Sequence, residues 1–305
     1  MKPLFAIPVF AILFVAAALF SVSEAYSQET IEYYSNSFST SSGSKFKAEI
    51  DLGNINVTGS SSDNVSIRIN GNPDYKNDFI ISANQVSDGV ELTINYKDKK
   101  DRSYKNLSLK VDVTVPSSYS IDLKTKGGNV TANGISGVVE AVSYGGNIKM
   151  NSIIGKTDLS TKGGNIVVNS IRGNLNVMTQ GGNVLVDAFT GDIKTQTKGG
   201  NITLSGGDGS VSAMTNGGNI SLEYSGSNLG IDLKTMAGNI TAKVPEIISG
   251  DAEITATTGK IVSDFITPKK GDEFSVSSRA LGKINGGGSP ILISTNSGNI
   301  KFVKK

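Results

Sequence analysis

Thr-Lys-Gly-Gly-Asn-Val, residues 125–130, is the first copy of a phrase that decides the fold. Gly-Gly-Asn followed by Ile or Val recurs along the chain, and the Asn residue advances by 18 positions five times and then by 20. The last and weaker copy reads Ala-Gly-Asn-Ile. A short period kept this strictly predicts stacked coils of nearly identical structure. The Asn residues of the series are Asn129, Asn147, Asn165, Asn183, Asn201, Asn219 and Asn239.

Each coil contains two stretches of alternating residues. In the first coil, Ile121 and Leu123 lie eight and six residues before the Asn, with a hydroxyl residue four before it. Val130 and Ala132 follow the Asn with the same alternation. Period-2 alternation predicts two short strands per coil. Gly-Gly-Asn between them predicts a turn, because Gly and Asn tolerate positive φ.

A second corner is expected near Gly137 and its equivalents, eight residues after each Asn. An apolar residue two positions earlier would fill this corner: Ile135, Ile153, Ile171 and Phe189. Stacked coils would pair strand on strand about 4.8 Å apart and share one core. The Asn and Thr columns would then form ladders in which each side chain bonds its own copy in the next coil. The expected turn residues are Asn54, Gly127, Gly128, Asn129, Asn147, Asn165, Asn183, Asn201, Asn219, Asn239 and Asn299.

The chain outside the series divides by composition. Residues 1–25 have the charged start, apolar run and small-residue cleavage site of a secretory signal peptide, and no further membrane span is expected after cleavage. A final strand at 291–303 is expected to cap the far end. The predicted parts are a polar leader (26–45), an N-terminal β cap with a first coil (46–120), the regular solenoid (121–243) and irregular C-terminal coils with a cap (244–305), with 46–305 as one continuous domain.

Composition excludes several classes of function. The chain has no Cys, so export does not imply disulfides, and it has no His, so His-based triads and His metal sites are excluded. A net charge of +2 gives no case for nucleic acid. We expect no catalytic, cofactor-binding or metal-binding residues. A calcium β-roll would need Asp at the sixth position of the turn, where the repeats have Ala, Met, Val or Leu.

Several motifs together resemble a known family. They are Asp-Leu-Gly-Asn-Ile at 51–55, Val-Thr-Val-Pro at 113–116, the Thr-x-Gly-Gly-Asn-Ile series and Gly-Gly-Gly-Ser-Pro-Ile-Leu-Ile-Ser-Thr-Asn-Ser-Gly-Asn-Ile at 286–300. The sequence is similar to the bacterial putative-adhesin β-strand-repeat family, kin of the head GIN domains of auto-transporter adhesins. The resemblance covers essentially the whole chain after the signal. It implies an all-β fold, namely a single-stranded, right-handed β-solenoid with irregular β caps at both ends, and it offers no catalytic residues.

Two outward columns are candidates for a ligand face. Asp122, Glu140 and Asp158, seven residues before the Asn, would stack as like charges, which repel unless something offsets them. Lys124, a bound cation or solvent could do so. A glycosidase needs two carboxylates about 5–9.5 Å apart, and Asp122 and Asp158 would fall near the upper limit, but on a flat face. The other column, four residues after the Asn, contains Asn133, Asn151, Asn169 and Asp187.

Three functions remain open. The first is an exported, non-enzymatic adhesin or envelope binding module that presents a flat repetitive surface to a glycan or another cell-surface ligand. The second is a structural envelope element that associates with itself. The third is a carbohydrate-active enzyme on a β-helix. The signal predicts a periplasmic, outer-membrane-associated or secreted protein.

Overall fold

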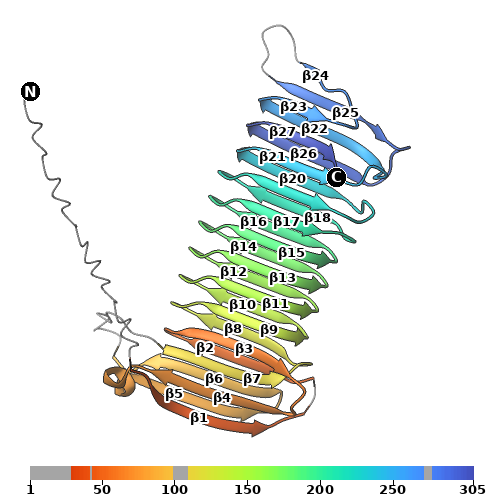
Figure 1. The fold of residues 1–305 in the computed structure, drawn as a ribbon. Coiled ribbons are helices and arrows are strands. Elements are labelled where there is room, and N and C mark those ends of the chain that lie inside the picture. The colour runs from red at the N-terminus through yellow and green to blue at the C-terminus, as the bar shows by residue number, and fades with distance from the viewer. Residues whose placement is uncertain (1–28, 42, 99–108, 271–276) are drawn as a thin grey trace, which may run out of the picture.

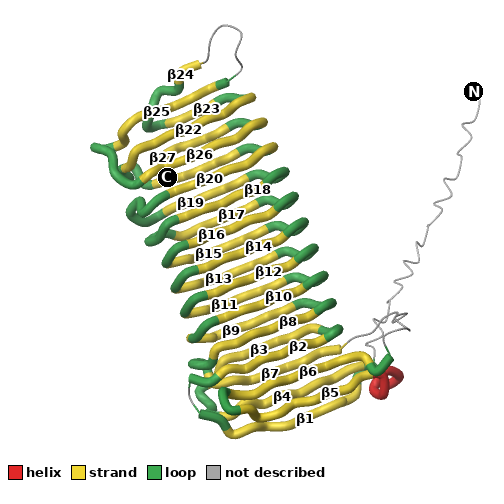
Figure 2. The backbone as a smooth tube through the Cα atoms, turned by 180° about the vertical axis from the view of Figure 1, so that it is seen from behind, coloured by secondary structure: helices red, strands yellow, loops and turns green. Residues whose placement is uncertain are grey.

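The computed structural model describes residues 29–41, 43–98, 109–270 and 277–305. The expected signal peptide at 1–25 lies outside the described residues. The described chain forms a rod of stacked coils (Figure 1), and the same stack is seen from behind in Figure 2. The expected all-β solenoid is confirmed. One short 3-10 helix, Pro73–Asp78, lies at the N-terminal end.

Within the described residues the strands form two sheets, one of 13 strands and one of 14. The 13-stranded sheet has the spatial order β1 (Ile31–Ser39), β4 (Asn64–Gly71), β7 (Leu109–Pro116), β3 (Asn54–Ser60), β9 (Val130–Ser136), β11 (Ile148–Ile154), β13 (Ile166–Arg172), β15 (Val184–Thr190), β17 (Ile202–Gly206), β19 (Ile220–Tyr224), β21 (Ile240–Val244), β27 (Ile300–Lys304) and β23 (Ile261–Ser263). The 14-stranded sheet has the spatial order β24 (Lys269–Lys270), β25 (Ser278–Ile284), β22 (Gly250–Thr258), β26 (Pro290–Ser297), β20 (Ile231–Ala237), β18 (Val211–Thr215), β16 (Ile193–Thr197), β14 (Leu175–Thr179), β12 (Thr157–Thr161), β10 (Val139–Ser143), β8 (Ser120–Thr125), β2 (Lys45–Ile50), β6 (Gly89–Tyr96) and β5 (Phe79–Val86).

Each regular coil gives one strand to each sheet, and equivalent residues of successive coils pair in parallel register. Asp122 pairs with Glu140, and Glu140 pairs with Asp158. The alternating apolar residues point inward and are buried, so the core is one continuous layer between the sheets. This layer holds the coils together, because a single two-stranded coil has no second surface against which to bury its apolar side chains.

The Gly-Gly-Asn turns stack closely, and this is the reason for their second Gly. A Cβ built on Gly182 would lie 1.8 Å from the carbonyl oxygen of Gly164, whereas one built on Gly181 would lie 3.9 Å from its nearest neighbour. No Asn of the series has a positive φ. The expectation of positive φ at the Asn was therefore wrong; the turn needs Gly because backbones of adjacent coils almost touch.

The Asn ladder exists, but with a different partner from the expected one. Each Asn Oδ1 accepts a hydrogen bond from the backbone N–H of the equivalent residue in the next coil, at 2.7–2.8 Å, instead of bonding mainly to the next side chain. A turn leaves backbone N–H groups without strand partners, and the Asn side chain supplies the missing acceptor.

The Thr column is buried beneath these turns and does not bond its own copies. Thr179 Oγ1 donates to the carbonyl of Gly164 in the preceding coil at 3.0 Å and accepts from the N–H of Gly182 in its own coil at 3.2 Å. The same pair of bonds recurs at Thr161, Thr197 and Thr215. The hydroxyl links adjacent turns because it can donate to the Gly carbonyl of one turn and accept from the Gly N–H of the next.

At the second corner the plugging residues Ile135, Ile153, Ile171 and Phe189 are buried. The residue before each plug has a left-handed backbone, with φ from 53° to 70°: Gly134, Ser152, Ser170 and Ala188. This bend turns the following side chain back into the core. The Ser and Ala residues give no sequence signal for it, because they rarely adopt this conformation.

The N-terminal end is closed by antiparallel strands. The segment expected to be a polar leader contributes β1, which pairs antiparallel with β4, and β4 pairs antiparallel with β7. In the other sheet β5 pairs antiparallel with β6. The coil of β2 and β3 lies between this cap and the regular stack, parallel to β8 and β9.

The C-terminal end corrects the expectation that residues 291–303 form the cap. The coil of β26 and β27 is inserted into the stack, between β20 and β22 in one sheet and between β21 and β23 in the other. The C-terminus accordingly lies beside the end of β21, where Lys305 N–H donates to the carbonyl of Val244, and below the end of the rod (Figure 1). The outer end is formed by β22, β23 and the antiparallel strands β25 and β24. Asn299 explains the order, since it continues the ladder between Asn239 and the backbone N–H of Lys260.

Candidate functional site

The two predicted ligand columns lie on different sheets. Asp122, Glu140 and Asp158 are on β8, β10 and β12 of the 14-stranded sheet, whereas the column of Asn133, Asn151, Asn169 and Asp187 is on β9, β11, β13 and β15 of the 13-stranded sheet. Each column is in register along its own sheet. The structure therefore provides two separate faces, and no single ligand site contains both columns.

Lysines offset the charge at the start of the acidic column. The Asp122 carboxylate lies 3.5 Å from Lys45 Nζ and 3.4 Å from Lys124 Nζ, and the residue is only 6% exposed. Glu140 is exposed on the next coil, and Asp158 is half-buried beside Lys156 at 3.3 Å. Asp122 is thus covered, and the accessible part of this column begins at Glu140.

In the amide column, neighbouring side chains bond each other. Asn169 Nδ2 donates to Asn151 Oδ1 at 2.8 Å, and Asp187 follows in register. These residues lie on the outer face of the 13-stranded sheet, where Asn133 and Asp187 are exposed and Asn151 and Asn169 are half-buried. The column resembles the amide ladders that stabilise stacked strands.

A trough runs along the 14-stranded sheet, where four successive strands begin. Each of β12, β14, β16 and β18 contributes the residue just before the strand and the second residue of the strand. The intervening side chains point inward and form the floor, which includes Thr157, Leu175 and Ile193. The trough has a volume of about 310 Å³, and its walls are Lys156, Asp158, Asn174, Asn176, Asp192, Lys194, Ser210 and Ser212.

Hydrogen bonds between coils order the trough walls. Asn176 Nδ2 donates to Asp158 Oδ1 at 3.2 Å. Asp192 Oδ1 accepts from the backbone N–H of Ser210 at 2.9 Å and from its hydroxyl at 2.8 Å. These two bonds favour the carboxylate and hold the pKa of Asp192 below its usual value. Lys194 has no ion-pair partner among the described residues.

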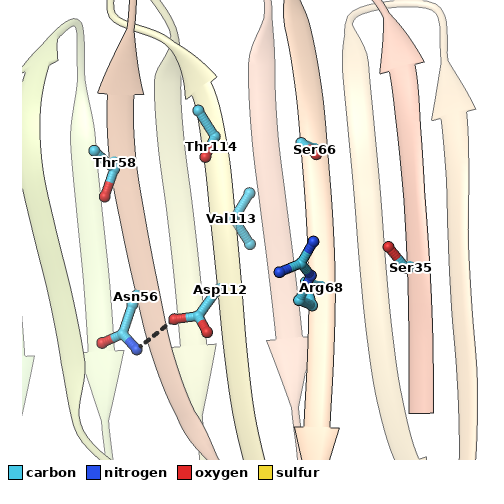
Figure 3. A pocket seen from close by; sticks show the side chains of 8 residues that line it. All are labelled: Ser35, Asn56, Thr58, Ser66, Arg68, Asp112, Val113 and Thr114. Carbon is cyan, nitrogen blue, oxygen red and sulfur yellow. Dashed lines mark hydrogen bonds between the residues drawn. The ribbon is translucent and has the colours of Figure 1, made fainter. Parts of the chain in front are cut away.

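A second concavity lies on the 13-stranded sheet, at the junction of the N-terminal cap and the first coil (Figure 3). Asn56, Asp112, Arg68 and Ser35 form one row across β3, β7, β4 and β1, and Thr58, Thr114 and Ser66 form the next row. The volume is about 300 Å³. The sequence did not predict this cap pocket, because its strands lie outside the repeat and cross in an order that no periodicity reveals.

The charged groups of the cap pocket are paired with one another. Asp112 accepts a hydrogen bond from Asn56 at 3.0 Å and forms an ion pair with Lys110 at 2.9 Å. Arg68 lies 3.5 Å from Glu32. Because each charge already has a partner and nothing in this pocket repeats from coil to coil, we consider the trough the better candidate for a binding site.

The third hypothesis, a carbohydrate-active enzyme, requires two carboxylates that a substrate can reach. Asp122 and Asp158 are two strands apart, with Glu140 between them in register, and the burial of Asp122 removes it from any substrate on this face. In the part of the chain that the structure describes, no three His, Cys, Asp or Glu side chains are grouped so as to hold a metal ion. None of the described helices is long and apolar enough to cross a membrane.

Comparison with known proteins identifies a family. The family model described as Toastrack DUF4097 matches residues 47–302. None of the curated proteins matches the sequence. The family match agrees with the β-strand-repeat family that the turn motifs resemble.

Solved structures with low sequence identity also match. A "putative adhesin" from Bacteroides fragilis NCTC 9343 is 20% identical, with 72% of this chain and 98% of that chain covered and a TM-score of 0.45. A "putative adhesin" from Parabacteroides merdae ATCC 43184 is 16% identical, with 70% and 89% covered and a TM-score of 0.29. A "putative lipid binding protein" from Parabacteroides distasonis ATCC 8503 is 13% identical, with 88% and 96% covered and a TM-score of 0.33. Each TM-score is below 0.5, so we base no inference on these structures.

Proposed function

The chain belongs to the Toastrack DUF4097 family, and we propose that this member is an exported, non-enzymatic, adhesin-like module that binds a cell-surface ligand along its rod. One observation carries the proposal. The outer face of the long 14-stranded sheet presents polar side chains in register, once per coil, over successive coils. Such a surface suits an extended ligand that can make the same contact repeatedly, because the contributions of many weak contacts add up within one ligand.

The structure gives less support to the alternative of a self-associating rod. At the N-terminal end β1 and β5 are antiparallel edge strands; at the C-terminal end the 14-stranded sheet finishes with the antiparallel strands β25 and β24, and the 13-stranded sheet finishes with β23, a parallel strand of only three residues. Capping strands of this kind interrupt the parallel stacking that would let one rod continue into another. We therefore keep binding, and not end-to-end assembly, as the proposed function.

The first test is location. A small epitope would be added after Lys305, an exposed residue, and intact cells of the natural host would be treated with protease before fractionation. We expect the epitope to be removed by the protease or found in the medium. An epitope that is protected in intact cells and released only with the periplasm would contradict the adhesin-like role.

A further inference from the structure

We propose that the trough binds one extended chain of a neutral polysaccharide, lying parallel to the long axis of the rod with one sugar residue per coil. The inference rests on the proposed binding function and names the class of its ligand. The trough spans four coils, from β12 to β18, so the bound segment would be about four sugar residues long.

The spacing of the coils selects a polysaccharide over a polypeptide. Paired strands lie about 4.8 Å apart, close to the length of one pyranose ring in an extended chain. An extended polypeptide advances only about 3.3 Å per residue and would lose register with the coils after one or two steps. A sugar chain can therefore meet equivalent positions on successive coils, and an extended peptide cannot.

The polar side chains of the walls fit sugar hydroxyls, and the floor between them leaves room for the rings. Each coil offers a pair of side chains, one from each wall: Lys156 with Asp158, Asn174 with Asn176, Asp192 with Lys194, and Ser210 with Ser212. Amides and hydroxyls both donate to and accept from sugar hydroxyls, whereas the carboxylates accept and the lysines donate. Between the walls, Thr157, Leu175 and Ile193 turn their side chains into the core, so no side chain projects from the floor to obstruct a sugar ring.

The charge of the trough selects a neutral polymer. Its two lysines, Lys156 and Lys194, are matched by two carboxylates, Asp158 and Asp192. A polyanion would gain nothing from a surface with no net charge and would meet both carboxylates. Nucleic acids and acidic polysaccharides are therefore disfavoured in this trough.

The ends of the trough are marked by changes in one of its two wall columns, the residue just before each strand. In the coil before β12, the wall position before the strand is Val138, which is apolar and 42% exposed. In the coil after β18, the equivalent position is Gly230, which has no side chain, and the step between coils lengthens to 20 residues. The paired polar walls thus end on both sides, which limits the footprint.

The experiment measures binding of the purified mature chain to defined neutral glycans. The probes would be soluble mixed-linkage β-glucan, glucomannan and xylan, then linear oligosaccharides of two to six residues cut from whichever polymer binds, with carboxymethylated cellulose as the polyanion. We expect affinity to rise with length up to about four residues and then level off. Raising the salt concentration about tenfold should leave the affinity unchanged, because no net charge is neutralised.

A matched pair of variants locates the site. Asn174→Ala with Asn176→Ala removes one coil's pair of wall amides, and we expect about a tenfold loss of affinity. Asn151→Ala with Asn169→Ala removes two amides from the opposite sheet and should leave affinity unchanged. Circular dichroism and thermal unfolding would show that both proteins remain folded.

Three results would overturn the proposal: no binding to any neutral polymer, tighter binding to the polyanion with strong salt dependence, or equal affinity in both double variants. Binding of a polyanion would reject the neutral ligand and leave the proposed adhesin-like function standing. A periplasmic location would reject that function whatever the trough binds.

Discussion

At the scale of single residues, two threonines test what the buried hydroxyls do. Thr179 is 2% exposed, and its hydroxyl bonds both the carbonyl of Gly164 and the N–H of Gly182. Thr179→Val keeps the shape and leaves both backbone groups without a partner. We expect unfolding free energy to fall by about 1–3 kcal/mol, measured by urea denaturation.

Thr195 should respond in the opposite direction to the same substitution. It is fully buried in the core column, where its hydroxyl has no hydrogen-bond partner. Its equivalents in other coils are apolar, including Val177 and Ala213. Thr195→Val should raise the unfolding free energy by about 1 kcal/mol, because an unsatisfied polar group leaves the core. If Thr195→Val lowered the unfolding free energy as much as Thr179→Val does, the loss of hydrogen bonds would not be the cause of the effect at Thr179.

The sequence predicted that a hydroxyl recurs in every coil, but not what it bonds. The partner of Thr179 is a carbonyl in the preceding coil, and only the stacking of the turns brings the two together. A repeat shows which residues are equivalent, whereas the hydrogen bonds between coils depend on how closely their backbones approach. The same reason explains why the Asn ladder was expected with the wrong partner.

At the scale of the turn, the two glycines of one phrase should differ in their tolerance of substitution. A Cβ at Gly182 would lie 1.8 Å from the carbonyl oxygen of Gly164, and one at Gly181 has no neighbour closer than 3.9 Å. We expect Gly181→Ala to change the thermal midpoint little. Gly182→Ala should separate adjacent turns and lower the unfolding free energy by more than about 2 kcal/mol, as overpacked cores do. Equal effects of the two substitutions would contradict the close-stacking explanation.

The positions of turns and strands were predictable, and the bend at the second corner was not. Glycine marks the corners and period-2 alternation marks the strands, because both features are visible in the residue types. The left-handed residues Ser152, Ser170 and Ala188 leave none. Their conformation is imposed by the need to bury the next side chain, for example Phe189 after Ala188. Tertiary packing decides the backbone at these positions.

At the scale of the whole molecule, stability should be nearly independent of pH around neutrality. The chain has no His and no Cys. Hydrogen bonds from Ser210 lower the pKa of Asp192, and a hydrogen bond from Lys305 lowers that of Glu223, while burial raises the pKa of Tyr33 to about 12. We expect a constant thermal midpoint from about pH 5.5 to about pH 9.

The sign of the change at low pH follows from the two lowered carboxyl pKa values. Asp192 and Glu223 stabilise the fold above their unfolded pKa, and this contribution is lost as the pH falls below the ordinary carboxyl range and through their lowered folded pKa. Both residues are exposed or half-buried, so each loss should be small. A transition centred near pH 6.5, the ordinary pKa of His, would contradict the assignment.

The number of coils and the presence of caps were predictable, but the place of the last coil was not. Two degenerate turns, at 258–261 and 297–300, are each compatible with the repeat. Chain order suggested that the later turn lies outermost. In the structure, the turn that keeps an Asn occupies the inner place, because Asn299 can accept from the next coil and Lys260 cannot. A non-local choice of this kind does not appear in local patterns.

The inserted coil predicts what its removal would do. Deleting residues 290–305 removes β26 and β27, so β20 and β22 lose their shared partner in one sheet, and β21 and β23 lose theirs in the other. Parallel strands with unpaired backbone groups are open to pairing with other chains. We expect the truncated protein to form concentration-dependent oligomers in sedimentation experiments, and its β20 and β21 amides to lose protection from hydrogen exchange. A control with six Gly and Ser residues inserted in the turn at 285–289 lengthens the connection and keeps both strands, so it should stay monomeric and protected. A truncated chain that behaved like this control would show that the last coil is an accessory to the rod and not part of its continuous core.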